Sequence, residues 1–152
     1  MSLLKTALKA NDVAVPAAGD ADGNAFIRHI WETETSSLLP SVQIRDTTEH
    51  YSETVDLSDW GTFSLRVGNT LKDENGNIVS CHATLQFDQY GNSYNTKNAA
   101  GENVNIELPY GYVFITPEDY PLFNYLASIH LSVKADVTPA SGAIQIFIVK
   151  KR

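Results

Sequence analysis

The chain has 152 residues, 43% of them hydrophobic and 19% charged, with a formal net charge of −7. This length suits one globular domain with a substantial core. The 11 Lys and Arg residues argue against nucleic acid as a direct partner, because phosphates are bound by clustered positive charge. No segment approaches the roughly 18 consecutive apolar residues of a membrane-spanning helix, so we expect no membrane partner.

Residues 1–25 are predicted to be an arm or linker, because they are too poor in bulky side chains to pack by themselves. Their bulky apolar residues are Leu3, Leu4 and Leu8, and Pro16 stops any helix. One interpretation is a frayed terminus. The other is an arm that orders against a partner subunit, with these leucines as anchors and with Phe26 and Trp31 adding docking contacts just after it.

From Ala25 onward, apolar and polar residues alternate with a period of two, which is typical of strands with one buried face. Phe63, Leu65 and Val67 fall on one face, as do Cys81, Ala83 and Leu85 on another strand. The predicted strands are Phe26–Glu32, Val42–Arg45, His50–Asp56, Thr62–Val67, Ile78–Phe87, Val104–Leu108, Gly111–Ile115, Ile129–Asp136 and Ala143–Lys150.

At most one short helix is predicted, within Pro117–Ala127. Thr116 is placed to cap it, and Pro121 limits it to about one turn followed by a second short piece. Since helices are missing between the strands, we predict an all-β fold, an antiparallel, jelly-roll-like β-sandwich over residues 26–152. Its last two strands, joined by a turn at 139–142, are expected to seal the sheets as an edge-to-edge ribbon.

The sequence offers no group poised for chemistry, so we expect no enzyme, catalytic residue, metal or cofactor. Calcium-type loops begun at Asp20 and Asp73 would need a glutamate at positions that hold Trp31 and Thr84. No histidine pair has the spacing of a zinc helix. Cys81 is the only cysteine, which excludes an intrachain disulfide, and its place on an apolar strand face predicts a buried thiol.

Several aromatic residues admit two interpretations. Tyr90 and Tyr94 flank a Gly-Asn loop, and with Tyr110 they could form a stacking platform for a glycan. The alternative is that most tyrosines belong to the sandwich core, with the hydroxyl reaching its edge.

The segments 108–136 and 141–152 resemble the C-terminal half of tailed-bacteriophage virion accessory proteins of the capsid decoration (cement) type. The resemblance implies a non-enzymatic protein on the capsid surface, often a trimer, bound to the major capsid protein or other virion subunits. The start of the chain lacks a secretory signal pattern, so we expect synthesis in the host cytoplasm. The competing function is a carbohydrate-binding or host-adsorption fibre or tip module.

Overall fold

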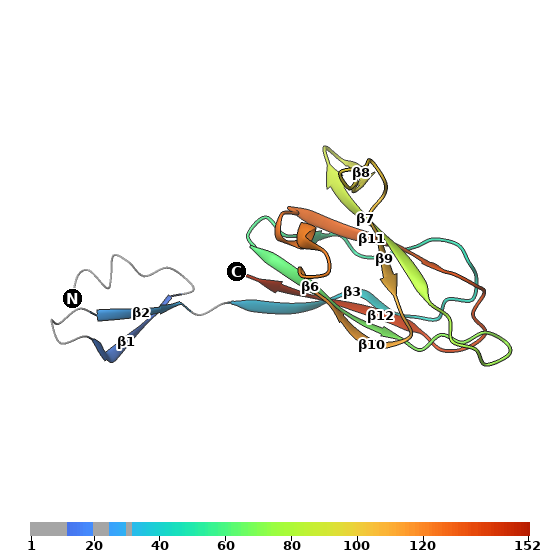
Figure 1. The fold of residues 1–152 in the computed structure, drawn as a ribbon, viewed down its shortest axis with the longest axis horizontal. Helices are drawn as coiled ribbons and strands as arrows, with labels where there is room; N and C mark the ends of the chain where they lie inside the picture. Colours follow the sequence, from blue (N-terminus) through green and yellow to red (C-terminus); the bar gives the residue numbers. More distant parts are fainter. Residues whose placement is uncertain (1–11, 20–24, 30–31) are drawn as a thin grey trace.

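The structure is a computed structural model, and it describes residues 12–19, 25–29 and 32–152. Two antiparallel sheets pack face to face (Figure 1). Sheet I has the order β10-β6-β12-β3, and sheet II has the order β4-β11-β7-β8, with β5 also pairing with β11 and β9 with β7. The strands are β3 (Thr33–Val42), β4 (His50–Tyr51), β5 (Val55–Asp56), β6 (Thr62–Asn69), β7 (Cys81–Gln89), β8 (Asn92–Asn95), β9 (Asn105–Leu108), β10 (Gly111–Ile115), β11 (Ser128–Ala135) and β12 (Ile144–Lys151).

The strand order confirms the predicted jelly-roll-like sandwich. β4 and β5 both pair with β11, and β8 and β9 both pair with β7, so each pair acts as one interrupted strand. Counted in this way there are eight strands, and the chain passes repeatedly from one sheet to the other between consecutive strands. Each sheet therefore contains strands from both halves of the chain. This double-sheet arrangement closes an all-β core with few exposed edges.

The core lies between the sheets, where the inward-facing positions of both meet. In sheet I, Phe63, Leu65 and Val67 are buried as predicted, and in sheet II Cys81 and Leu85 are buried opposite them. Alternation along each strand places polar neighbours on the two outer faces. The outer faces of sheets I and II are therefore the broad surfaces on which binding groups can be displayed.

A short 3-10 helix, η1 (Pro121–Asn124), closes one end of this core. The ring of Phe123 stacks on that of Phe63 with centroids 4.3 Å apart. The prediction of at most one short helix in this region is confirmed. Thr116 stabilises the turn before it, since its hydroxyl accepts from Glu118 N and its amide donates to Asp119.

Two strands of the sandwich, β3 and β8, were not predicted, and one predicted strand is wrong. β3 covers Thr33–Val42, whereas the sequence placed a strand at Val42–Arg45. β3 is an edge strand that buries only Leu38 and Leu39, and its register against β12 shifts around Pro40.

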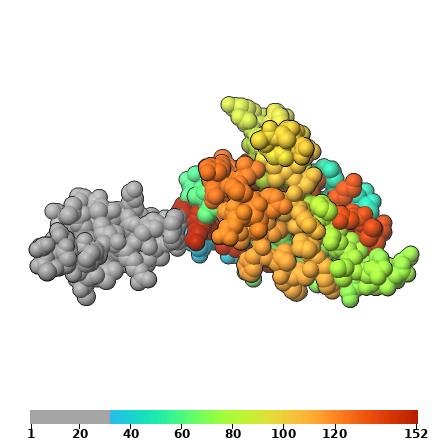
Figure 2. Space-filling view, in the orientation of Figure 1, coloured from blue at the N-terminus to red at the C-terminus, as the bar shows by residue number. Residues whose placement is uncertain are grey.

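β8 is exposed at every position, so no buried face marks it in the sequence. The β7–β8 hairpin projects beyond the sheets in Figures 1 and 2.

The expected terminal ribbon is absent from this part of the chain. β11 lies in sheet II between β4 and β7, and β12 lies in sheet I between β3 and β6. The turn signal at 139–142 therefore joins two sheets instead of two neighbours in one sheet. The Asn-Gly loop at 73–77 behaves in the same way, because it carries the chain from β6 to β7 with only the Lys72–Ile78 bridge at its base.

β1 (Asp12–Gly19) and β2 (Ala25–His29) pair with each other and form a two-stranded sheet of their own. The sequence predicted an arm where β1 lies, and assigned β2 to the sandwich as part of Phe26–Glu32. The ladder is regular from Asp12 to Ala14 and shifts before Gly19. Pro16 falls in the irregular stretch, since proline has no amide proton to donate to a ladder.

Cys81 is predicted to be chemically inert in the native protein. Burial raises the pKa of its thiol to about 12, so almost no thiolate, the reactive form, exists near neutral pH. We expect iodoacetamide to label Cys81 only in denatured protein, which mass spectrometry of treated samples will check. Rapid labelling of the native protein at pH 8 would contradict the complete burial of Cys81, whose exposed fraction is 0%.

Candidate functional site

The outer face of sheet I carries exposed aromatic side chains around one arginine. Tyr112 and Phe114 on β10 are 78% and 66% exposed. The guanidinium carbon of Arg66 lies 5.6 Å from the centroid of the Phe114 ring and 5.9 Å from that of Phe147. We call Arg66, Tyr112, Phe114, Gln145 and Phe147 the aromatic face.

Strand register assembles the aromatic face. Phe114 and Phe147 are both paired with Arg66, on either side of the central strand β6. Tyr112 and Gln145 are likewise both paired with Gly68. A side chain at Gly68 would meet the Tyr112 ring, since a Cβ there would lie 2.9 Å from its Cε1. Glycine therefore lets the Tyr112 ring lie over β6 beside a shallow hollow of about 150 Å³.

The aromatic face combines exposed aromatic rings with an oriented arginine. Tyrosine, phenylalanine and arginine are the residue types enriched at protein interfaces, where a few such anchors supply most of the binding energy. Arg66 is already oriented by cation–π contacts to two rings, so docking would cost it little side-chain freedom. Tyr112 and Phe114 are not marked as outward in the sequence, because every position after Gly111 in β10 is bulky and none is polar enough to indicate an outer face.

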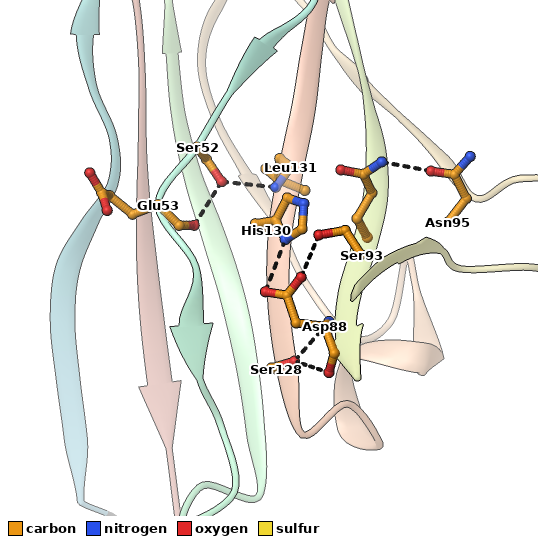
Figure 3. Close-up of polar contacts among 9 residues, drawn as sticks. Ser52, Glu53, Asp88, Ser93, Asn95, Ser128, His130 and Leu131 are labelled. Atoms are coloured by element: carbon orange, nitrogen blue, oxygen red, sulfur yellow. Dashed lines mark hydrogen bonds and ion pairs between the residues drawn. The ribbon is translucent and has the colours of Figure 1, made fainter. Parts of the chain in front are cut away.

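The outer face of sheet II carries a recess of about 460 Å³. We call it the polar recess, and Figure 3 draws its hydrogen bonds. Its side chains come from β4, β7, β8, β11 and the segment between β4 and β5. The lining residues are Tyr51, Ser52, Thr54, Gln86, Ser93 and His130.

Asp88 organises one side of the polar recess. Ser93 Oγ donates to Asp88 Oδ1 at 2.6 Å, and His130 Nδ1 lies 3.4 Å from Asp88 Oδ2 (Figure 3). The backbone amide of Asp88 donates to Ser128 Oγ at 3.2 Å. The hydrogen bond from Ser93 is the main reason that the pKa of Asp88 lies below its usual range, with Thr54 and His130 contributing less. Asp88 is therefore ionised at neutral pH.

Three polar atoms at this face are buried without a hydrogen bond. They are Gln86 Oε1, Ser132 Oγ and His130 Nδ1, the last of which has, among the described residues, only its 3.4 Å contact with Asp88 Oδ2. His130 is only 6% exposed, although it lies at an outward position of β11. Unpartnered buried polar groups are uncommon in native structures and each calls for a physical reason. The alternation of apolar and polar residues marks the outward position of His130, but it does not show that the side chain is buried.

The tyrosines proposed as a glycan platform do not come together. Tyr90 lies in the β7–β8 turn, and Tyr94 stacks on Phe87 with centroids 5.7 Å apart. Tyr110 follows β9, whose end pairs with Cys81 at the other end of β7, and the Lys72 Nζ lies 5.9 Å from its ring. The two ends of β7, which has nine residues, are separated by about 26 Å, at about 3.3 Å per residue.

The docking side chains predicted in the arm and just after it lie outside the described part of the chain. Leu3, Leu4, Leu8 and Trp31 lie outside the described residues, and Phe26 lies in β2 with its side chain outside them. Within the described residues, no group of three or more His, Cys, Asp or Glu side chains could hold a metal ion. Nor is any helix there long and apolar enough to span a membrane.

Comparisons with known proteins give little further information. No family model matches the chain, and no curated protein matches it. A solved structure that does match is that of the SPBc2 prophage-derived protein YomS, at 11% identity and a TM-score of 0.47. The match covers 84% of this chain and 99% of that one. A likeness at this level supports no conclusion about fold or function.

Proposed function

We propose that this chain is a non-enzymatic structural protein of a bacteriophage virion, which decorates the capsid and stabilises it through subunit–subunit contacts. The observation that carries the proposal is the aromatic face on sheet I, where the Tyr112 and Phe114 rings are largely exposed and Arg66 lies against the Phe114 and Phe147 rings. Large exposed aromatic side chains mark surfaces that bind another protein. The similarity of segments 108–136 and 141–152 to capsid decoration proteins supplies the virion as the setting.

The proposed partner of the aromatic face is the major capsid protein. Tyr112 and Phe114 lie on β10, an edge strand of sheet I, so a partner can contact both the sheet face and its open edge. We expect a closed cyclic oligomer, which is the usual form of self-association, and we favour a trimer because the resemblance to capsid decoration proteins implies one. The same proposal places the protein on the outer capsid surface.

A double substitution on the aromatic face tests the proposal. We expect Tyr112→Ser with Phe114→Ser to weaken binding to phage heads by at least about tenfold, because interface anchors of this type dominate affinity. Heads for the assay come from phage in which the gene for this chain is deleted, and cosedimentation measures binding of the added protein. Tyr125→Ser is the matched control, since Tyr125 is 81% exposed and lies outside the aromatic face. Equal binding by the double variant and the control would contradict the proposal.

The arm provides a separate prediction. Deleting residues 2–20 removes β1, whose one partner among the described strands is β2, so both sheets of the sandwich should fold as before. If the arm orders against a partner subunit, the deletion abolishes binding to the same heads while circular dichroism and the thermal midpoint of the sandwich stay unchanged. Full binding by the shortened protein would leave the arm without a docking role.

A further inference from the structure

We infer that the polar recess on sheet II is a binding site for a neutral oligosaccharide. The inference does not depend on the capsid role, because the polar recess and the aromatic face lie on the outer faces of different sheets. In a face-to-face sandwich these outer faces point in opposite directions. A protein docked through sheet I could therefore still present the polar recess to solvent.

The first argument is the set of unsatisfied polar groups at the recess. His130, nine-tenths buried and lining the recess, makes no hydrogen bond from Nδ1, whose one polar contact within the part of the chain that the structure describes is the 3.4 Å approach to Asp88 Oδ2. Gln86 donates from Nε2 to Asn95 Oδ1 at 2.7 Å, which leaves Oε1 without a donor. A ligand that brings hydroxyl groups would relieve this cost, because one hydroxyl can both donate and accept.

The second argument is the neutral, mixed character of the lining. Apart from His130, the lining side chains carry hydroxyl or amide groups, and they come from separate strands of sheet II. Tyr51 adds a ring that is 61% exposed at the rim of the recess. Its hydroxyl donates to Glu49 Oε2 at 2.7 Å, which fixes one end of the ring. A few convergent polar groups beside an aromatic surface suit a sugar, which has hydroxyls at its edge and C–H groups on its faces.

The third argument is charge, which selects a neutral ligand. Asp88 lies against His130 and Ser93 with its pKa lowered, so it carries a negative charge at neutral pH. Glu49 adds a second carboxylate at the Tyr51 hydroxyl. No Lys or Arg is among the lining residues. Phosphorylated or sialylated ligands would meet repulsion here, and the chain as a whole carries a net charge of −7.

The experiment uses the full-length protein on an array of immobilised neutral and sialylated oligosaccharides. We expect retention on at least one neutral glycan and none on the sialylated ones. Titration calorimetry with the retained glycan in soluble form then compares four proteins: the wild type, Tyr51→Ala, Gln86→Leu and the control Tyr125→Ala. Tyr51→Ala should weaken binding about tenfold, the upper range for a lost ring contact, and Gln86→Leu should weaken it similarly by removing an acceptor. Tyr125→Ala should bind like the wild type.

Three results would overturn the inference: no retention on any neutral glycan, binding restricted to sialylated glycans, or unchanged affinity in both recess variants. A second measurement covers the case in which a variant fails to fold. Amide chemical shifts of the wild-type protein, followed during titration with the soluble glycan, should change around Ser93, Gln86 and His130. Changes centred on Tyr90 or Tyr110 instead would place the glycan elsewhere and contradict the inference.

Discussion

Replacing Gly142 with alanine is expected to destabilise the protein by at least about 3 kcal/mol, combining left-handed backbone strain with a steric clash. Gly142 has a φ of +82°, and a Cβ there would overlap the carbonyl oxygen of Thr70 and lie 2.9 Å from the Cα of Leu71. Both neighbours are backbone atoms, so no side chain can rotate away to make room. Urea unfolding of both proteins measures the difference.

The close approach at Gly142 connects β12 to the end of β6. Thr70 N donates to Ala143 O at 2.9 Å, and Ala143 N donates to Thr70 Oγ1 at 3.0 Å. Widening this contact would also break those hydrogen bonds.

Gly76→Ala is the matched control for Gly142. Gly76 has a similar φ of +77°, but a Cβ there would meet nothing within 4 Å. Its substitution should therefore cost only the backbone term of roughly 1 kcal/mol. Equal losses of stability in the two variants would contradict the steric explanation.

Replacing Asn69 with alanine is expected to cost roughly 3–5 kcal/mol, through lost hydrogen bonds, unpaired backbone groups and a small cavity. Asn69 is fully buried at the end of β6. Its Nδ2 donates to Val79 O at 2.9 Å and to Leu108 O at 3.1 Å, and its Oδ1 accepts from Leu71 N at 2.9 Å. This side chain therefore ties a strand of sheet I to the end of β9 in sheet II.

Asn105→Ala provides the comparison for Asn69. The Asn105 side chain is exposed and accepts one hydrogen bond, from Thr84 Oγ1 at 2.9 Å. Its loss should cost no more than about 1 kcal/mol. Chemical unfolding of both variants checks the ranking, and an Asn69→Ala protein as stable as Asn105→Ala would contradict the role of the buried amide.

The strands that could be predicted from the sequence are those with one buried face. β6 alternates Phe63, Leu65 and Val67 with polar or small residues, and its burial follows that pattern. β8 is exposed throughout and β3 is held mainly by its pairing to β12, so neither carries a period of two. Periodicity reports which face of a strand is buried, because side chains alternate.

Periodicity does not report which strands are neighbours, and both sites depend on neighbours. β11 and β12 were predicted as strands, yet their assignment to different sheets follows from long-range packing. The aromatic face exists because Phe114 and Phe147, far apart in the chain, both pair with Arg66. Conversely, Tyr90 and Tyr110 are closer in sequence than Phe114 and Phe147 but lie at opposite ends of β7. When the chain alternates between two sheets, the separation of two residues in sequence does not indicate their separation in space.

Electron microscopy of purified virions labelled with an antibody against this chain tests its proposed structural role most directly. The particles come from the phage that encodes the chain, and particles with the gene deleted serve as the control. A regular array of label over the capsid surface is the expected result, and averaged images of unlabelled particles should place sheet I against the capsid. Label confined to the tail or its tip, or no label on intact particles, would contradict a capsid decoration protein.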